Sequence, residues 1–449
     1  MIESLSLTNF YSFKERTEIS FAAGKERNRV SDLKYKGFEE LDFVNLLKTV
    51  YVYGDNGAGK TKLIKAFEQL SYLVAQTREN KVDSLRYVPF AFDPEMSERN
   101  SEIELVYFWR GRRYRYSIEW NVDAIYNEEL YIKNSRSEVC LFQRRYNSQR
   151  RVVEVDFSRR LRLDDTEKYI LVSALLQNNS VLSLMGTTNV YNEELHDQWL
   201  FFRQGFEVVH FENIELESSL PDDKTSQGRQ LKRLVLDVLK AVGSNIVNYT
   251  KIPVQRKIPV AMLERLKRMN ADERNELLEL FMDSPEFIIK TWHDVGRDRP
   301  LELNFSDQSD GTIQILKLLI CMQDAILKHK TIILDDCVNG IHPNILNSLQ
   351  SFFLGAAMDS QLVIVSQNYS FLDMEHIRRD SVRFVSKDRL GESHVGAIQL
   401  ATLHKNQNLR KSVSTTNQWD QLPFIDDFKL GEVIEYYRNI ENSFDEFLY

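Results

Sequence analysis

The sequence predicts an α/β fold: a mixed, largely parallel sheet covered by helices, into which an antiparallel β-lobe and a mainly helical arm are inserted. Three observations support this. A Gly-rich phosphate-binding motif at residues 54–61 lies between an apolar strand and a helix. From Arg86 the apolar residues follow a period of two, which indicates antiparallel strands. From Pro300 strands and helices alternate, and their continuously apolar strands are typical of parallel sheets.

The phosphate-binding motif fits G-x-x-x-x-G-K-[ST], with Gly54, Gly59, Lys60 and Thr61 in the fixed positions. The β-branched run 49–53 before it predicts a buried strand, and helical spacing of apolar residues after it predicts a helix from Lys60. Such a turn directs backbone N–H groups at phosphates, Lys60 reaches the β- and γ-phosphates, and Thr61 ligates Mg²⁺. We therefore expect ATP and Mg²⁺ as ligands. The loop residues expected to contact the nucleotide are Gly54, Asp55, Asn56, Gly57, Ala58, Gly59, Lys60 and Thr61.

Composition narrows the class of protein. The chain has 449 residues, 43% hydrophobic and 28% charged, which is typical of a folded chain of one to three domains. No apolar run of about 18 residues is present, so we expect no membrane span. The N-terminus lacks a signal-peptide pattern and the three cysteines fit no metal spacing, so we expect a cytoplasmic location. The net charge of −8 gives no overall attraction to nucleic acid.

Local patterns predict the elements of the first half. Loose alternation predicts two edge strands between Ile2 and Phe21. Two strands flanking a turn at Gly111 form a hairpin. The β-lobe strands are expected at 102–109, 113–120, 129–132, 138–143 and 152–157. The lobe also carries arginine clusters within 110–115, 144–151 and 159–162, which fit either a solvated sheet face or a patch that binds a phosphate backbone or a partner.

In the second half of the chain, we expect a mostly helical stretch to give way to alternating helices and strands at Pro300. Residues 165–290 are interpreted as mostly helical, with one helix ending near Gly243 and a pair over 263–280. Beyond Pro300 we expect helices at 312–327 and 345–354 and strands at 331–336, 361–366 and 381–386. An apolar stripe with an acidic opposite face predicts a helix over 430–449, which either packs on its own domain or docks a partner.

The strand at 331–336 is expected to supply the second half of the nucleotide site. Asp335 ends this apolar strand, at the edge where open α/β sheets place their ligands. We expect Asp335 to hold Mg²⁺ together with Thr61, and Asp336 to lie beside the water that attacks the γ-phosphate.

Six stretches resemble, in order, the ABC-type ATPase heads of the SMC/RecF/OLD superfamily. More narrowly, they resemble the AAA-type ATPases of bacterial defence islands (AbiLi/RloA-like proteins, AriA of PARIS, PtuA of Septu). The stretches are 5–14, 51–61, 89–105, 305–312, 334–343 and 364–373. The resemblance implies an ABC-type P-loop NTPase head divided into four parts. These are 1–164 (first half with β-lobe), 165–299 (helical arm or lid), 300–405 (second half) and 406–449 (tail with an amphipathic helix).

The resemblance also implies a mechanism. Two heads pair head to tail, and each ATP lies between the P-loop of one and Ser309, Asp310 and Gly311 of the other, with His342 in the adjoining D-loop region. Two residues depart from the family: Asp336 replaces its usual Glu, and Gln367 replaces its usual His. Asp is one methylene shorter than Glu and Gln carries no charge, so we expect ATP to be bound and hydrolysed slowly.

The resemblance finally implies the partners. We expect a homo-oligomer and a separate nuclease or toxin subunit, HNH or Toprim-like, in an anti-phage defence complex for which the chain acts as a nucleotide-dependent sensor or scaffold. DNA and a phage protein stay open as triggers. The alternative is a RecF/SMC-like DNA repair ATPase, which predicts salt-sensitive DNA binding through the arginine clusters. A transporter motor is disfavoured, because the full signature and the switch His are missing.

Overall fold

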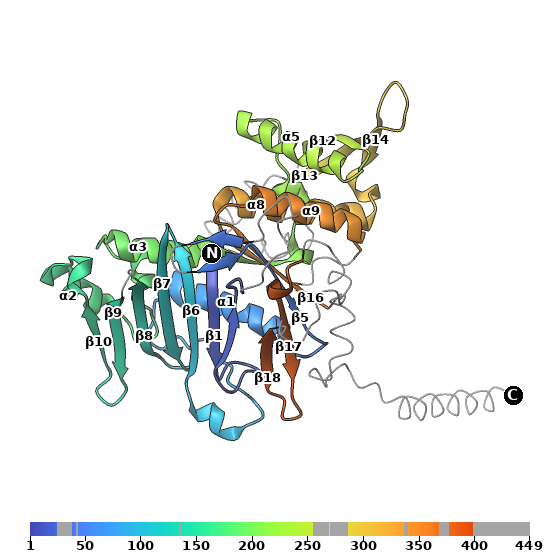
Figure 1. Ribbon diagram of the computed structural model, residues 1–449. Helices are drawn as coiled ribbons and strands as arrows, with labels where there is room; N and C mark the ends of the chain where they lie inside the picture. Colours follow the sequence, from blue (N-terminus) through green and yellow to red (C-terminus); the bar gives the residue numbers. More distant parts are fainter. Residues whose placement is uncertain are drawn as a thin grey trace.

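A six-stranded sheet carries the phosphate-binding motif (Figure 1). The computed structural model describes residues 1–24, 38–41, 44–133, 137–254, 269, 286–335, 340–367 and 377–397. The strands, in spatial order, are β11 (Phe206–His210), β15 (Thr331–Asp335), β16 (Gln361–Ser366), β5 (Thr49–Tyr53), β17 (Val382–Lys387) and β18 (Ser393–Ala397). All neighbours are parallel except β17 and β18, so the predicted parallel sheet is confirmed.

Helices cover both faces of this sheet. They are α1 (Lys60–Ala75), α8 (Asp310–Lys328) and α9 (Pro343–Ala356). On β5, Val50 and Val52 join the core that contains α1, whereas Tyr51 and Tyr53 join the core that contains α8 and α9. Because successive side chains of a strand point to opposite faces, a strand covered on both faces is buried throughout, as all five residues of β5 are.

The predicted β-lobe is a seven-stranded antiparallel sheet, seen at the left of Figure 1. Its order is β10 (Val152–Phe157), β9 (Glu138–Asn147), β8 (Ile125–Lys133), β7 (Arg112–Trp120), β6 (Ser101–Trp109), β1 (Ile2–Thr8) and β2 (Thr17–Ser20). The expected hairpin is confirmed, with Gly111 at φ 75° in its turn. Residues of both large sheets and of α1 share one core, so α1 is packed between the two sheets.

The expectation that residues 165–290 are mostly helical is wrong in part. Helices α2 (Asp165–Ala174), α3 (Glu193–Leu200), α4 (Leu216–Ser219) and α5 (Ser226–Ala241) are present, and α5 ends before Gly243 as predicted. However, β11 joins the central sheet. Strands β12 (Ile246–Val254) and β13 (Glu286–His293) form an antiparallel sheet with β14 (Leu301–Asn304). Short strands are decided by the neighbours they pair with, which local sequence does not reveal.

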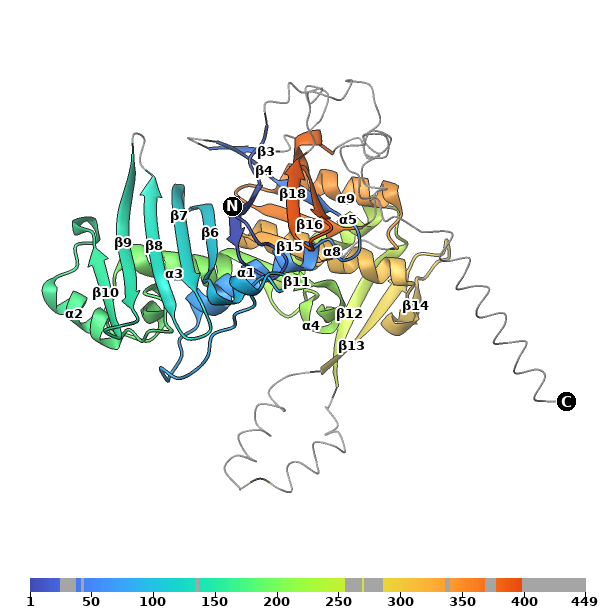
Figure 2. The ribbon, with the colours of Figure 1, turned by 90° about the horizontal axis from the view of Figure 1, so that it is seen from below.

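We call β12, β13 and β14 the arm sheet. Figure 2 shows β12 and β13 leading away from the head. A further pair of short strands, β3 (Phe38–Glu40) and β4 (Asn45–Leu47), adjoins the N-terminal strands. The helix pair expected over 263–280 and the tail at 406–449 lie outside the described residues, and the four-part division of the chain stays a prediction. No helix in the described part of the chain is both long and apolar enough to cross a bilayer.

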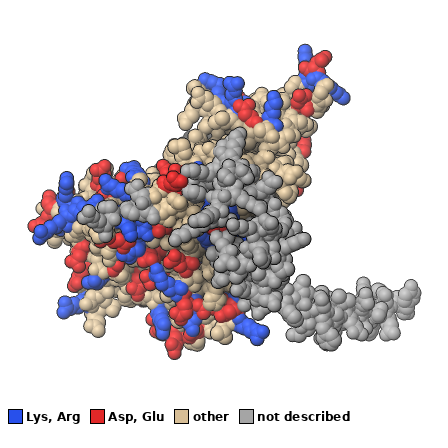
Figure 3. Space-filling model, viewed as in Figure 1, with Lys and Arg blue, Asp and Glu red and all other residues tan. Residues whose placement is uncertain are grey.

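All four arginines of the first predicted cluster are engaged by carboxylates. Arg110 pairs with Asp197 at 2.5 Å and Arg112 with Glu194 at 3.0 Å. The remaining pairs of this cluster are Arg113 with Glu3 and Glu138, and Arg115 with Glu104 and Glu138. Acidic and basic side chains accordingly intermix over the β-lobe in Figure 3. This arrangement fits the solvated sheet face better than a phosphate-binding patch.

Candidate nucleotide site

The phosphate-binding loop connects β5 to α1 as the sequence predicts. Gly57 and Gly59 have φ of 80° and 114°, a region that side-chain-bearing residues rarely adopt. Gly59 is the N-cap of α1 and has no side chain that could cap the first turn. N–H groups at this end of the helix can therefore donate hydrogen bonds to an anion. The buried ammonium of Lys60 donates to the carbonyls of Gly54, at 2.6 Å, and Asp55, at 2.9 Å.

Two segments distant in sequence, β18 and the β1–β2 connection, support the phosphate-binding loop through hydrogen bonds. Ser393 Oγ on β18 donates to Ala58 O at 2.6 Å and bonds to Ser12 Oγ in the β1–β2 connection at 2.8 Å. A Cβ on Gly59 would lie 2.4 Å from Ser393 Oγ, and a Cβ on Gly54 would lie 2.3 Å from Val385 O. Gly54 is therefore needed for packing, and Gly59 for packing as well as for its positive φ.

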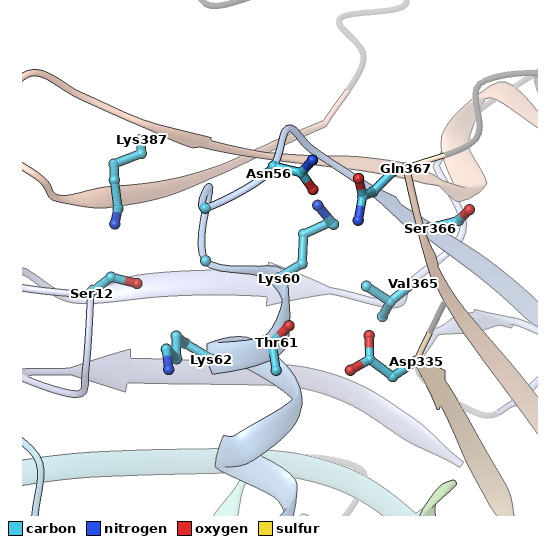
Figure 4. Close-up of a pocket in the computed structure, with 12 residues that line it drawn as sticks. Ser12, Asn56, Lys60, Thr61, Lys62, Asp335, Val365, Ser366, Gln367 and Lys387 are labelled. Atoms are coloured by element: carbon cyan, nitrogen blue, oxygen red, sulfur yellow. The ribbon is translucent and has the colours of Figure 1, made fainter. Parts of the chain in front are cut away.

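A cavity of about 410 Å³ opens over this loop (Figure 4). Figure 4 places the hydroxyl of Thr61 and the carboxylate of Asp335 facing each other at one end, and the amide of Gln367 next to the ammonium of Lys60. At the other end lie Ser12, Lys62 and Lys387. Its lining consists of Ser12, Asn56, Gly57, Gly59, Lys60, Thr61, Lys62, Asp335, Val365, Ser366, Gln367 and Lys387.

The two ends suit different parts of a nucleotide. Thr61 and Asp335 offer hard oxygen donors, which Mg²⁺ prefers. At the other end, burial and the ammonium groups of Lys65 and Lys387 lower the pKa of Lys62, so cations crowd there. Burial likewise raises the pKa of Asp55 in the loop, although Lys60 opposes the shift. The cavity thus fits a polyphosphate whose terminal, metal-bound end lies at Asp335.

Several expected residues meet in this cavity, and some contributors were missed. Asn56, Gly57, Gly59, Lys60, Thr61, Asp335 and Gln367 line it as expected, whereas Asp336 lies outside the described residues. Sequence reasoning missed Ser12, Lys62, Val365, Ser366 and Lys387. Lys62 directly follows the motif and Ser12 lies in a stretch that carries the family resemblance, so both had a signal. Lys387 lies in residues 378–388, which also fit the family, and the pairing of β17 beside β5 brings it to the cavity.

The expected signature residues lie apart from the cavity. Ser309 caps α8, and its Oγ accepts from Thr312 N at 3.2 Å. A Cβ on Gly311 would lie 3.3 Å from Gly340 O, so this turn packs against the segment before His342. His342 in turn caps α9, accepting from Asn344 N at 3.2 Å. We call Ser309–Gly311 the signature loop. It forms an exposed surface with the start of α9 and contributes nothing to the cavity lining of its own chain.

Comparison with known proteins identifies the family. The family described as "AAA domain, putative AbiEii toxin, Type IV TA system" matches residues 50–373, most of the chain. The chain belongs to this AAA family. This AAA domain has an α/β fold, in which the P-loop lies in a six-stranded sheet covered by helices and an antiparallel sheet packs beside it.

Two solved structures are similar to this AAA domain. One is an SMC head domain from Thermotoga maritima, with 10% identity, a TM-score of 0.39, and coverage of 89% of this chain and 99% of the other. The other is an SMC head bound to the C-terminal winged-helix domain of ScpA, with 13% identity, a TM-score of 0.40, and coverage of 89% and 98%. Neither likeness is close enough to carry a function. The search of curated proteins gave no match.

One further residue of this AAA domain lies at the same edge of the sheet as Asp335. His210 ends β11 and is in register with Asp335 at the end of β15. Its Nε2 lies 2.8 Å from the carboxylate of Glu68 on α1. Because parallel neighbours in register point to the same face, His210 and Asp335 both face α1. Spacing alone gave His210 no role, because β11 lies in the region expected to be helical.

Proposed function

We propose that this AAA domain is an ATP-binding ATPase whose ATP-bound form pairs head to tail with a second copy. The observation that carries the proposal is the convergence of the P-loop, Asp335 and Gln367 in one cavity, together with an exposed signature loop that lies outside it. A cavity lined on one side by phosphate-binding groups and open elsewhere is completed by a second chain. Ser309 and the N-terminus of α8 are accessible for that purpose.

ATP binding replaces the internal hydrogen bonds of Lys60. Its ammonium leaves the carbonyls of Gly54 and Asp55 and bonds to the β- and γ-phosphates, which form stronger, charge-assisted bonds. Thr61 and Asp335 would hold Mg²⁺, and the ion would neutralise charge on the phosphates. Gln367 donates a hydrogen bond to the γ-phosphate but carries no positive charge, so hydrolysis is slow and ATP acts as a lasting link between two chains.

We further propose that the pair serves as a nucleotide-dependent sensor or scaffold in anti-phage defence. The family description, which names a putative toxin of a type IV toxin–antitoxin system, supports such a setting. The effector would be a separate nuclease or toxin subunit, HNH or Toprim-like. The DNA-repair alternative has less support, because Arg110, Arg112 and Arg113 are engaged by carboxylates.

Nucleotide binding and self-association test the proposal. Titration with a fluorescent ATP analogue should give saturable binding to the purified chain, abolished in Lys60→Ala and retained in the control Lys168→Ala, an exposed lysine on α2. Asp335→Asn should bind ATP but lose the effect of Mg²⁺. Mass measurement should show dimers with ATP and monomers without it. Retained binding by Lys60→Ala, or monomers at saturating ATP, would overturn the proposal.

Two measurements distinguish a role in anti-phage defence from a role in DNA repair. Purification from native expression, followed by mass spectrometry, should recover a nuclease or toxin subunit in a fixed ratio to the chain. ATP hydrolysis should be slow and unchanged by added DNA. Stimulation of hydrolysis by DNA, lost at raised salt, would instead support the repair ATPase.

A further inference from the structure

The arm sheet is bonded to the signature loop by a buried polar cluster. His293, which ends β13, is 7% exposed and Thr291 is 1% exposed. The Nε2 of Gln308 lies 3.1 Å from His293 Nε2 and donates to Thr291 Oγ1 at 2.9 Å. Gln308 directly precedes Ser309, the cap of α8. A side chain next to the signature loop is therefore held by two residues of the arm sheet.

The hydrogen-bond pattern assigns the protonation of His293. Its Nδ1 lies 2.9 Å from Asn245 Oδ1, an oxygen that only accepts, so Nδ1 carries the proton. Its Nε2 then has one lone pair, within reach of both the Gln308 amide and Thr291 Oγ1, each 3.1 Å away; Thr291 Oγ1 can instead donate to Leu303 O at 3.3 Å, which leaves the lone pair to Gln308. Burial lowers the pKa of His293, which favours this neutral form. Both N–H groups of Gln308 are thus used on the arm sheet.

The signature loop has a second, covalent connection to the same sheet. Strand β14 pairs with β13 and leads through a short 3-10 turn, Phe305–Asp307, into Gln308. Phe305 is buried in the core that includes Tyr249 of β12, Ile289 of β13 and the inner face of α8. A movement of the arm sheet therefore displaces Gln308 through the chain and through its side chain together.

We propose that His293 and Gln308 are positioning residues that fix the signature loop to the arm sheet, so that the position of the arm controls the pairing of two ATP-bound chains. This inference rests on the proposed function. Neither residue lines the nucleotide cavity, so they act on pairing and leave nucleotide affinity unchanged. A ligand or partner that displaces the arm sheet acts on the signature loop by the same route.

The test is Gln308→Leu, which keeps the size of the side chain and removes both donors. The matched control is Lys290→Ala, which removes an ion pair between β13 and β14 (Lys290 to Glu302, 2.5 Å) without touching Gln308. ATP affinity is measured with a fluorescent analogue, and self-association is measured by sedimentation with a non-hydrolysable analogue. We expect Gln308→Leu to bind ATP within twofold of the wild type and to dimerise at least tenfold more weakly. Lys290→Ala should match the wild type in both.

The double variant Gln308→Leu, His293→Leu tests whether the two residues affect dimerisation through the same contact or independently of each other. If the two residues act as one clamp, the double variant should dimerise no more weakly than the weaker single variant. Unaltered dimerisation of Gln308→Leu, while the wild type dimerises with ATP, overturns the inference alone. Loss of ATP affinity together with dimerisation also overturns it, because that result indicates a general structural role. A wild type that stays monomeric with ATP overturns the proposed function and the inference with it.

Discussion

His210 and Asp335 are register partners at the ends of two neighbouring parallel strands, β11 and β15. Glu68 on α1 holds the imidazole of His210 at 2.8 Å. Neither His210 nor Glu68 lines the cavity, but the register places His210 on the strand next to Asp335, the expected Mg²⁺ ligand. A side chain outside the cavity therefore adjoins that ligand.

Replacing His210 should affect the metal more than the nucleotide. Residues beside metal ligands orient those ligands, and their loss commonly lowers metal affinity about 10- to 100-fold. We expect His210→Leu to raise the Mg²⁺ concentration needed for half-maximal ATP binding about tenfold, with metal-free binding unchanged. The control is His329→Ala, the exposed C-cap residue of α8. Equal Mg²⁺ dependence of His210→Leu and the wild type would contradict this role.

Gln367 is expected to limit the rate of hydrolysis. It lines the cavity, where Figure 4 shows its amide next to the ammonium of Lys60, and it can offer the γ-phosphate only a neutral donor. Gln367→His supplies a group that can carry positive charge, and groups that stabilise developing charge contribute large factors to rate. We expect about a tenfold faster release of phosphate at unchanged ATP affinity, and a slower release from Gln367→Leu. A rate unchanged in both variants would show that Gln367 does not act on the phosphate.

The loop glycines should differ in their tolerance of alanine. A Cβ on Gly54 would lie 2.3 Å from Val385 O, a backbone atom that cannot rotate away, whereas a Cβ on Gly57 has no atom within 4 Å. Gly57→Ala should cost about 1–2 kcal/mol, for its positive φ alone. Gly54→Ala should cost about 3 kcal/mol and abolish ATP binding, because β5 must separate from β17. Thermal unfolding and ATP titration compare the two; equal losses would contradict the packing argument.

Glu128 should make the stability of the β-lobe depend on pH. Burial raises the pKa of Glu128 from 4.5 to about 7, although Arg144 opposes the shift. Because the folded state binds this proton more tightly than the unfolded state, the stabilisation is complete below pH 4.5. It is lost as pH rises from 4.5 to about 7. The loss is on the order of 1–3 kcal/mol.

The pH effect can be assigned to Glu128 by substitution. Glu128→Gln keeps one acceptor oxygen, for Val181 N, and its NH2 group can donate to the hydroxyl of Tyr116, but it does not titrate. Its free energy of unfolding, measured with urea across pH 5 to 8, should decline less with rising pH than that of the wild type. Glu138→Gln, on the exposed part of the same sheet, should keep the wild-type slope in this window. An unchanged slope in Glu128→Gln would contradict the assignment.

Much of the local structure follows from the sequence. The run 49–53, the Gly-rich loop and the helix from Lys60 are correct to the residue at most of their ends. They depend on interactions between near neighbours: an apolar strand, glycines at positive φ and apolar residues at helical spacing. The same holds for the strand that ends at Asp335, because a short apolar run followed by carboxylates reaches the ligand edge of a parallel sheet.

The tertiary structure alone decided what surrounds these motifs. Strand β11 forms where residues 206–210 pair with β15, and only that pairing brings His210 beside Asp335. Ser393 and Lys387 reach the loop through the β17–β18 hairpin, and Gln308 reaches His293 through the arm sheet. Such contacts join residues far apart in the chain, so their energy depends on strand pairing and packing that no local pattern records. The sequence by itself determined the nucleotide motif, and the fold determined which side chains complete and control it.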